Sequence, residues 1–220
     1  LLVTGEERIG ALSFGSDLAG PKRIFPDNMN LDSAEITESV DLEYAEELAR
    51  KLDKNRLEPL TQDEKKVARL IFRGSSIIGG ARPKITARLH GDLWVAKFSR
   101  EDDRMNIVKA EYATMKLAAL LGLDVPEIKL KKIGLKSAER DIYLIKRFDR
   151  KLNHKKYHMI SCLTALGAHE SEAHLKSYTD IAFELKKLSA QPKEDCRELY
   201  RRMIFNILVN NTDDHLKNHS

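Results

Sequence analysis

In the first third of the chain, hydrophobic residues recur every three to four positions in two segments. Residues 41–52 and 61–73 show this spacing, which predicts two amphipathic helices. The second helix begins with Thr61-Gln62-Asp63-Glu64, a pattern typical of a capping box. The Gly-rich segment 74–84 (GSSIIGGARPK) is then expected to end that helix as a loop.

Alternation with a period of two follows the Gly-rich segment and predicts antiparallel strands. Residues 85–90 and 93–98 are expected to form a hairpin that turns through Gly91-Asp92. Along the second strand, odd and even positions face opposite sides of the sheet, so Lys97 shares a face with Leu93 and Val95. Two further strands are expected at 128–133 and 141–148.

The helical period returns later and dominates the end of the chain. We expect a helix at 105–121 before the last two strands, and helices at 159–166, 178–189 and 193–210 after them. The order of elements predicts an α+β fold with two lobes, in which a small mixed lobe contains the antiparallel sheet and the other lobe is helical.

The two ends and one internal boundary divide the chain further. Residues 1–14 resemble two short strands around a Gly5-Glu6-Glu7 turn, and residues 15–40 are rich in Gly, Pro, Asp and Asn, as in a loop. The pattern changes near Arg150. Because the sequence begins without Met and ends directly after a polar cluster, we expect it to be a fragment of a longer protein.

Composition narrows the class of protein only slightly. The chain of 220 residues is 42% hydrophobic and 33% charged, as expected for a folded globular protein. No apolar run approaches the roughly 18 residues of a membrane-spanning helix, so we expect a cytoplasmic protein. The net charge of +4 is too small to indicate a nucleic-acid partner, and the two cysteines have no metal-ligand spacing.

The Gly-rich segment is the first candidate for chemistry. Gly79 and Gly80 would let backbone N–H groups approach an anion closely, while Arg82 and Lys84 add positive charge. The segment matches neither a Walker A motif nor G-x-G-x-x-G, so an ordinary connecting loop remains an alternative.

Lys97 strengthens the phosphate-binding interpretation. A lysine on a half-buried strand face needs a partner, and Glu111 lies on an apolar stripe of the following helix. Kinases use a Lys–Glu pair of this kind to orient the phosphates of ATP. A purely structural ion pair is the alternative.

The densest polar cluster lies at residues 210–218 (NNTDDHLKN), directly after an apolar helical segment. Phosphoryl transfer needs a carboxylate to accept a hydroxyl proton and an amide oxygen nearby to help hold Mg²⁺. Asp213 and Asn218 match the D-x-x-x-x-N spacing of kinase catalytic loops. A solvated helix C-cap is the alternative interpretation.

Taken together, several motifs resemble the HipA family of toxin kinases. They are GGARPK, LWVAKF, IKRFDR and NTDDHLKN, with further likeness in YHMISCLTALG (157–167) and ERIGALSF (7–14). The resemblance implies a two-lobed, protein-kinase-like fold that is truncated here. It also implies a remnant of an N-terminal subdomain at 1–14, an ATP-binding lobe at 15–150 and the start of a helical lobe at 151–220.

The resemblance also implies roles for individual residues. Asp213 would be the catalytic base, His215 would support it, and Asn218 would bind Mg²⁺. The ATP site would include Lys97 at the phosphates, Arg147 and Phe148 at the adenine, and Asp149 near the ribose. The Gly-rich loop, with Gly79, Gly80, Ala81, Arg82 and Lys84, would complete this site together with Glu111.

A loop serine that is autophosphorylated to silence the enzyme is a further implication, with Ser75 and Ser76 as the candidates. Family members have a second metal-binding aspartate beyond the catalytic loop, which this sequence does not reach. Without it, the chain on its own is expected to bind metal poorly.

The function implied is an ATP- and Mg²⁺-dependent serine/threonine protein kinase that acts as the toxin of a toxin–antitoxin pair. Its partners would be a translation-related protein substrate, such as an aminoacyl-tRNA synthetase, and a small DNA-binding antitoxin. Membrane binding is not expected, and direct binding to nucleic acid would be weak or absent. Two alternatives stay open, namely a small-molecule kinase and a non-catalytic remnant that binds the antitoxin.

Overall fold

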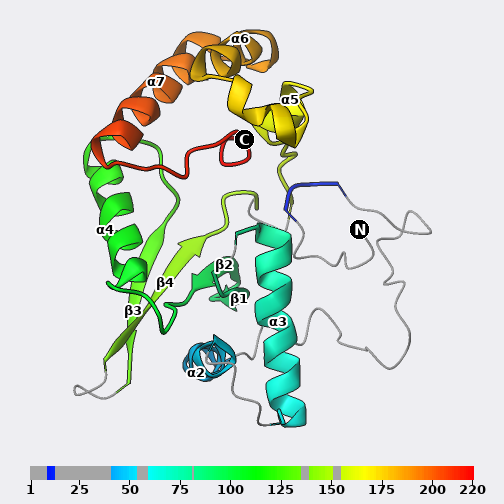
Figure 1. The fold of residues 1–220 in the computed structure, drawn as a ribbon. Coiled ribbons are helices and arrows are strands. Elements are labelled where there is room, and N and C mark those ends of the chain that lie inside the picture. Colours follow the sequence, from blue (N-terminus) through cyan, green and yellow to red (C-terminus); the bar gives the residue numbers. More distant parts are fainter. Residues whose placement is uncertain (1–8, 13–40, 54–58, 81, 135–138, 151–154) are drawn as a thin grey trace, which may run out of the picture. The chain divides into compact units, whose positions relative to one another are not determined.

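The computed structural model divides the chain into two compact units (Figure 1). One comprises Leu1–Met115 and Pro126–Tyr157 and contains the sheet, and the other comprises Lys116–Val125 and His158–Ser220 and is helical. We call them the sheet unit and the helical unit. The residues that the structure describes are 9–12, 41–53, 59–80, 82–134, 139–150 and 155–220.

The sheet unit is built on four antiparallel strands in the order β1-β2-β4-β3. The strands are β1 (Lys84–Leu89), β2 (Asp92–Lys97), β3 (Ile128–Ile133) and β4 (Arg140–Lys146). The hairpin between β1 and β2 turns at His90-Gly91, one residue earlier than predicted, because Asp92 already pairs with Leu89. Both turn residues have positive φ, 51° and 85°, as a type I′ turn requires.

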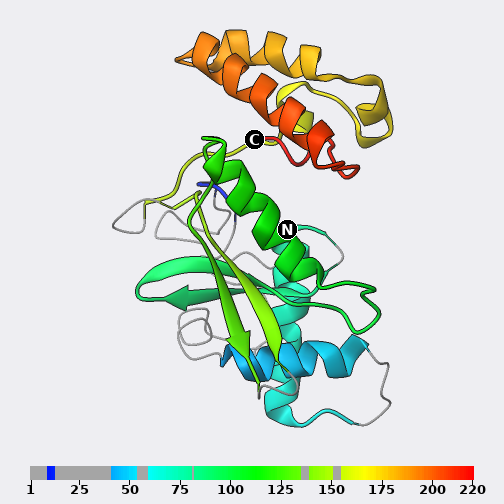
Figure 2. The same ribbon diagram turned by 90° about the vertical axis from the view of Figure 1, so that its left-hand side faces the viewer.

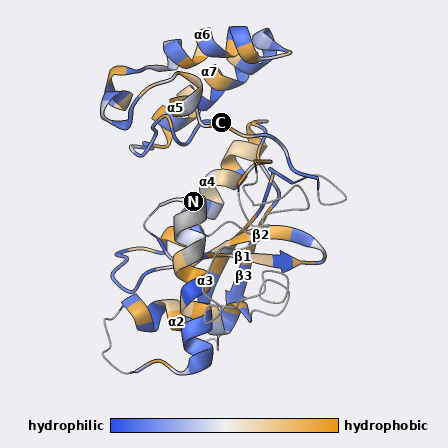
Figure 3. Cartoon of the chain, turned by 90° about the vertical axis from the view of Figure 1, so that its right-hand side faces the viewer, coloured by the Kyte–Doolittle hydropathy of each residue, from blue (hydrophilic) through white to orange (hydrophobic). Residues whose placement is uncertain are grey.

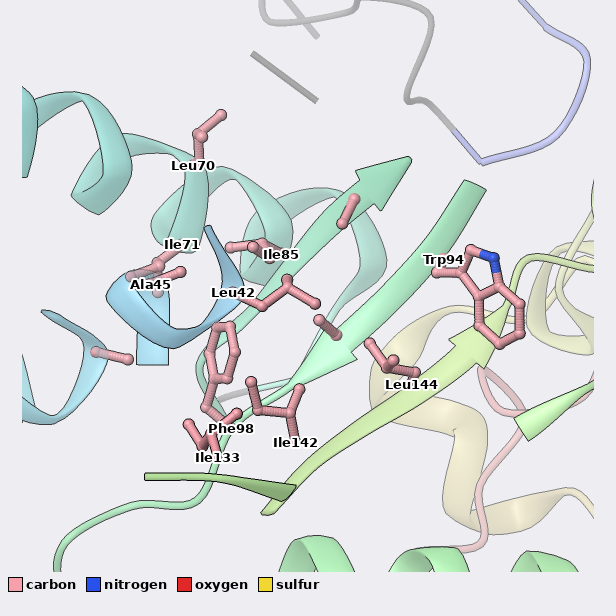
Figure 4. Close-up of a cluster of buried hydrophobic side chains, with 13 residues drawn as sticks. Leu42, Ala45, Leu70, Ile71, Ile85, Trp94, Phe98, Ile133, Ile142 and Leu144 are labelled. Atoms are coloured by element: carbon pink, nitrogen blue, oxygen red, sulfur yellow. The ribbon is translucent and has the colours of Figure 1, made fainter. Parts of the chain in front are cut away.

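One face of the sheet is covered by α2 (Leu42–Asp53) and α3 (Gln62–Ile78) (Figures 1 and 2). Trp94, Ala96 and Phe98 share one side of β2 by the alternation and belong to one buried cluster with residues of both helices. Figure 4 labels Trp94 and Phe98 in this cluster. Helix α3 begins with the predicted capping box, in which Thr61 and Glu64 bond to each other's backbone N–H groups. Burial of this cluster supplies the main hydrophobic stabilisation of the unit.

The opposite face carries Lys97 and Tyr143, which are direct neighbours on β2 and β4. The first half of α4 (Ile107–Leu120) packs there, with the rings of Tyr112 and Tyr143 in an edge-to-face contact at 6.1 Å. Asn106, just before the helix, donates a hydrogen bond to Asp141 at the start of β4. The start of α4 is therefore fixed to the sheet by both apolar and polar contacts.

The expected end of α3 at Gly74 is wrong, since the helix continues to Ile78. Gly74 lies where the helix passes closest to β1, and a Cβ on it would come within 2.2 Å of the Lys84 carbonyl oxygen. The glycine is there because only a residue without a side chain fits this approach. As a result, Ser75 and Ser76 lie in the last turn of a helix and not in a loop.

The helical unit contains α5 (Cys162–Ala165), the 3₁₀ helix η4 (Glu170–Leu175), α6 (Tyr178–Leu188) and α7 (Pro192–Leu208). Figure 3 shows hydrophobic and hydrophilic segments alternating along α6 and α7. Ile181 and Leu199 form a core with Leu216 of the C-terminal loop. The end of α4 is held to α7 because Arg201 and Arg202 donate to the carbonyl oxygens of Leu121 and Asp124.

These elements confirm the α+β class. The helix predicted at 159–166 is reduced to α5, because Ser161 caps it and a turn follows at Leu166-Gly167. No strand forms at residues 9–12, while the other residues of the two strands predicted at 1–14, and the loop at 15–40, lie outside the described residues. The predicted domain limits at 14 and 150 stay predictions.

In the described part of the chain, no helix has the length and hydrophobicity to cross a membrane.

Candidate active site

The best-defined pair in the sheet unit joins Lys97 of β2 to Glu111 of α4. Lys97 Nζ donates a 2.6 Å hydrogen bond to Glu111 Oε2. Both side chains are part-exposed, at 26% and 32%, so the pair remains open to solvent and to a ligand. The predicted pairing is confirmed, and its role in nucleotide binding stays a prediction.

Lys84 is a second lysine on the same face, directly opposite Lys97 in the β1–β2 register. It is buried, and Nζ donates to the carbonyl oxygens of Gly79 and Gly80 at 2.7 and 2.9 Å. Burial lowers the pKa of Lys84, and the neighbouring charge of Lys97 lowers it further. Two lysines against one glutamate leave an excess of positive charge on this face, which favours an anionic ligand.

The Gly-rich segment differs from the expected anion cradle. The N–H of Gly79 donates to Ser75 O and ends α3, so it is already engaged, while the two glycine carbonyl groups face Lys84. Arg82 is also engaged, through a bidentate pair with Asp103 at 2.7 and 2.8 Å. Ala81 lies outside the described residues. In this conformation the two glycine carbonyl groups are held by Lys84, and the Gly79 N–H would have to leave the Ser75 carbonyl oxygen to reach a phosphate.

Arg147 and Asp149 form a buried cluster after β4. The Asp149 carboxylate accepts bonds from the Arg147 and Arg150 guanidinium groups and from the backbone N–H of Gly10. Burial alone would raise the pKa of Asp149, but these bonds, led by the one from Arg147, bring it below its ordinary value. A ribose hydroxyl would have to share this carboxylate. Phe148 is 62% exposed and free to pack on a flat ring.

The loop after α7 carries the predicted catalytic residues of the helical unit. The Asp213 side chain is 89% exposed, and His215 Nε2 lies 3.6 Å from its Oδ1. Asn218 donates its amide N–H to the backbone carbonyl oxygen of Asp213, at 2.5 Å. This bond uses an N–H of the Asn218 amide group, and the amide oxygen is the atom that could serve as a metal ligand.

A carboxylate and an amide oxygen are the donor types that Mg²⁺ prefers, so the loop fits part of a magnesium site. Among the described residues, no three His, Cys, Asp or Glu side chains gather into a metal-binding group. Asp213 and Asn218 could therefore contribute ligands to a magnesium site without completing it.

Sequence reasoning missed the residues that hold this loop. Asp214 accepts bonds from Tyr178 of α6 and from His219, and the N–H groups of Cys162 and Leu163 in α5 donate to loop carbonyl oxygens. In the sequence, the nearest indication of this network is that the motif contains two adjacent aspartates. Only one of them can be the catalytic base, so the other is free for a different role.

The fold and these side chains define the class as an α+β protein with a Lys–Glu pair on an antiparallel sheet and a D-x-x-x-x-N loop. The HipA-like C-terminal domain family matches residues 76–220, and the chain belongs to this family.

Two curated relatives are similar over part of their length. A "Putative kinase" of Haemophilus influenzae is 30% identical over 122 residues, which is 52% of this chain and 36% of the relative. "Putative kinase Y4dM" of Sinorhizobium fredii is 27% identical over 144 residues, or 62% of this chain and 34% of the relative. The chain thus spans about a third of the length of each.

Proposed function

We propose that the protein to which this chain belongs is an ATP- and Mg²⁺-dependent serine/threonine protein kinase with a two-lobed, kinase-like fold. The observation that carries the proposal is the 2.6 Å Lys97–Glu111 pair. It joins a sheet to a helix in a chain that also contains an Asp–Asn loop with kinase spacing. Membership of the HipA-like family and two relatives named as kinases support the same activity.

In this proposal the sheet unit binds the nucleotide. The bond to Glu111 fixes the side-chain conformation of Lys97 on the sheet face. The Lys97 ammonium group is then already placed to contact the α- and β-phosphates, and less conformational entropy is lost on binding. Lys84 and the Gly79-Gly80 turn would border the phosphates, and Phe148 would pack on the adenine. Arg147 and Asp149 shape the strand end behind Phe148.

The helical unit performs the proton transfer. The serine hydroxyl of the substrate gives its proton to the Asp213 carboxylate as its oxygen bonds to the γ-phosphorus, and ADP leaves with the electrons of the broken P–O bond. His215, near Asp213, would stabilise the negative charge. Mg²⁺ bound through Asn218 would neutralise charge on the phosphates.

We extend the proposal to the biological role. A translation-related protein, such as an aminoacyl-tRNA synthetase, would be the substrate, and a small DNA-binding antitoxin would be the inhibitor. Ser75 or Ser76 would be the site of silencing autophosphorylation. Ser75 donates to the Arg82 carbonyl oxygen at 3.2 Å, so a phosphate on it would break that bond and place negative charge beside the Gly-rich turn.

The test is intact-mass analysis of the complete protein after incubation with Mg-ATP, with and without candidate protein substrates. The proposal expects a gain of one phosphate on a serine of the substrate, and of one on the peptide that carries Ser75 and Ser76. Phosphate transfer only to small molecules would replace it with a small-molecule kinase. ATP binding without any transfer, together with antitoxin binding, would identify a non-catalytic module.

A further inference from the structure

Two adjacent carboxylates in the loop after α7 have opposite environments. The Asp213 side chain is 89% exposed, whereas that of Asp214 is 15% exposed. The two residues are adjacent in the chain. Bonds that hold the Asp214 side chain inward therefore also restrict the stretch of backbone from which Asp213 projects.

Two side chains hold Asp214, and a third holds one of these two. The hydroxyl of Tyr178, the first residue of α6, donates to its Oδ2, and His219 Nε2 bonds to its Oδ1 at 2.8 Å. Asn206 of α7 donates to the same Tyr178 oxygen at 3.1 Å. The rings of Tyr178 and His219 also meet edge to face, at 5.4 Å. The Asp214 carboxylate thus joins α6 to His219 of the loop, and the Tyr178 hydroxyl extends this link to α7.

The tyrosine is a dependable donor over the physiological pH range. Burial raises the pKa of Tyr178 to about 12, and the hydrogen bond to Asp214 contributes to the rise. A carboxylate in place of the Tyr178 hydroxyl could not do the same, because its negative charge would repel that of Asp214.

The main chain of the loop is tied down at the same place. Cys162 N donates to His219 O at 2.8 Å, and Leu163 N donates to Leu216 O at 3.3 Å. Leu216 itself is buried in the core of the helical unit. The loop is therefore anchored on both sides of Lys217 and Asn218.

We propose that Asp214, held by Tyr178 and His219, is a positioning residue that presents Asp213 to the substrate and keeps Asn218 in register. This inference rests on the proposed kinase function. Asp214 does not touch the reacting groups. Its role is to exclude the alternative loop conformation in which the two aspartates exchange places.

The experiment compares Tyr178→Phe and Asp214→Asn with the wild type in the complete protein. Tyr200→Phe is the matched control, because it removes a tyrosine hydroxyl that lies on a 60% exposed side chain of α7. Two quantities are measured: kcat and KM for ATP in phosphotransfer, and hydrogen exchange of the Cys162, Leu163 and Asn218 amides, whose N–H groups are bonded within this region.

For both variants we expect kcat to fall about tenfold to a hundredfold, the penalty typical of a misplaced catalytic group, with KM for ATP within about twofold. Exchange of the three amides should accelerate. The double variant should be no slower than the slower single variant, because both act on one network. Tyr200→Phe should match the wild type in every measurement.

Two results would overturn the positioning role. One is wild-type kcat together with unchanged exchange in Tyr178→Phe. The other is an inactive Asp214→Asn beside an active Asp213→Asn, which would make Asp214 the base. A wild type that transfers no phosphate would refute the proposed function instead, and the exchange rates would then still decide whether Tyr178 and Asp214 hold the loop.

Discussion

The sheet unit and the helical unit fix their candidate site residues by different means. In the sheet unit the charged groups hold one another, with Lys97 on Glu111 and Arg82 on Asp103. In the helical unit the Asp213 side chain is 89% exposed, with His215 3.6 Å away. The backbone of Asp213 is hydrogen-bonded to the side chains of Asn211 and Asn218.

This difference suits the two tasks. A binding group gains from a partner that fixes its direction and leaves its charge unchanged. A general base must keep its carboxylate open to the substrate hydroxyl, so we expect its position to come largely from the residue next to it. A change in the sheet unit should therefore alter affinity or stability, and a change in the helical unit should alter turnover.

The largest expected effect is on turnover. Asp213→Asn in the complete protein should lower kcat about a hundredfold to ten-thousandfold, because the amide cannot accept the hydroxyl proton. ATP affinity, measured by calorimetry, should stay within about twofold. Glu194→Gln, which removes another carboxylate of the same unit, is the control and should be neutral. A strong loss of ATP affinity in Asp213→Asn would break the division of tasks.

Gly74→Ala should have the next largest effect, on stability. The added Cβ would meet a backbone carbonyl oxygen at 2.2 Å, which can only be relieved by moving α3 from β1. We expect a loss of about 3 kcal/mol, the upper end for overpacking, measured by urea unfolding. Gly167→Ala is the control, with positive φ but open space, and should lose only about 1 kcal/mol. If both variants lost the same free energy of unfolding, backbone conformation and not the contact with the carbonyl oxygen would explain the glycine at position 74.

Lys97→Met tests the sheet unit directly. It should weaken ATP binding about tenfold to a hundredfold, since a bond between charged groups is worth about 1.5–3 kcal/mol. Lys116→Met on the exposed part of α4 is the control for a lost positive charge. Unchanged ATP affinity, measured by calorimetry, would leave Lys97–Glu111 as a structural ion pair.

The smallest expected effect is a pH dependence of stability from Asp149. The pKa of this carboxyl is lower in the folded protein than its ordinary 3.8. Its contribution is therefore complete above pH 3.8 and is lost as the pH falls through the folded value. Asp149→Asn should flatten the decline of melting temperature below about pH 4. An unchanged acid limb would show that other carboxylates cause the decline.

The sheet and the helix before it could largely be predicted from the sequence. Alternation with a period of two, after a helix that begins with a capping box, fits few other structures. The Lys97–Glu111 pair followed from the same alternation. The end of α3 was not predictable, since Gly74 is explained by a contact with a strand ten residues later. The network around Asp214 also escaped prediction, because Tyr178 and Asn206 are brought to the loop by tertiary packing.

The bond between Gly10 and Asp149 has a consequence for how the protein is made. Its two partners are 139 residues apart in the chain. At about 5–20 residues per second, a ribosome needs roughly 7 to 30 seconds to proceed from one to the other. During that time the Asp149 carboxylate is not available to the Gly10 amide, so this hydrogen bond can form only after all four strands have been synthesised. Premature release of the nascent chain anywhere before residue 149 would therefore produce a polypeptide in which this link cannot form.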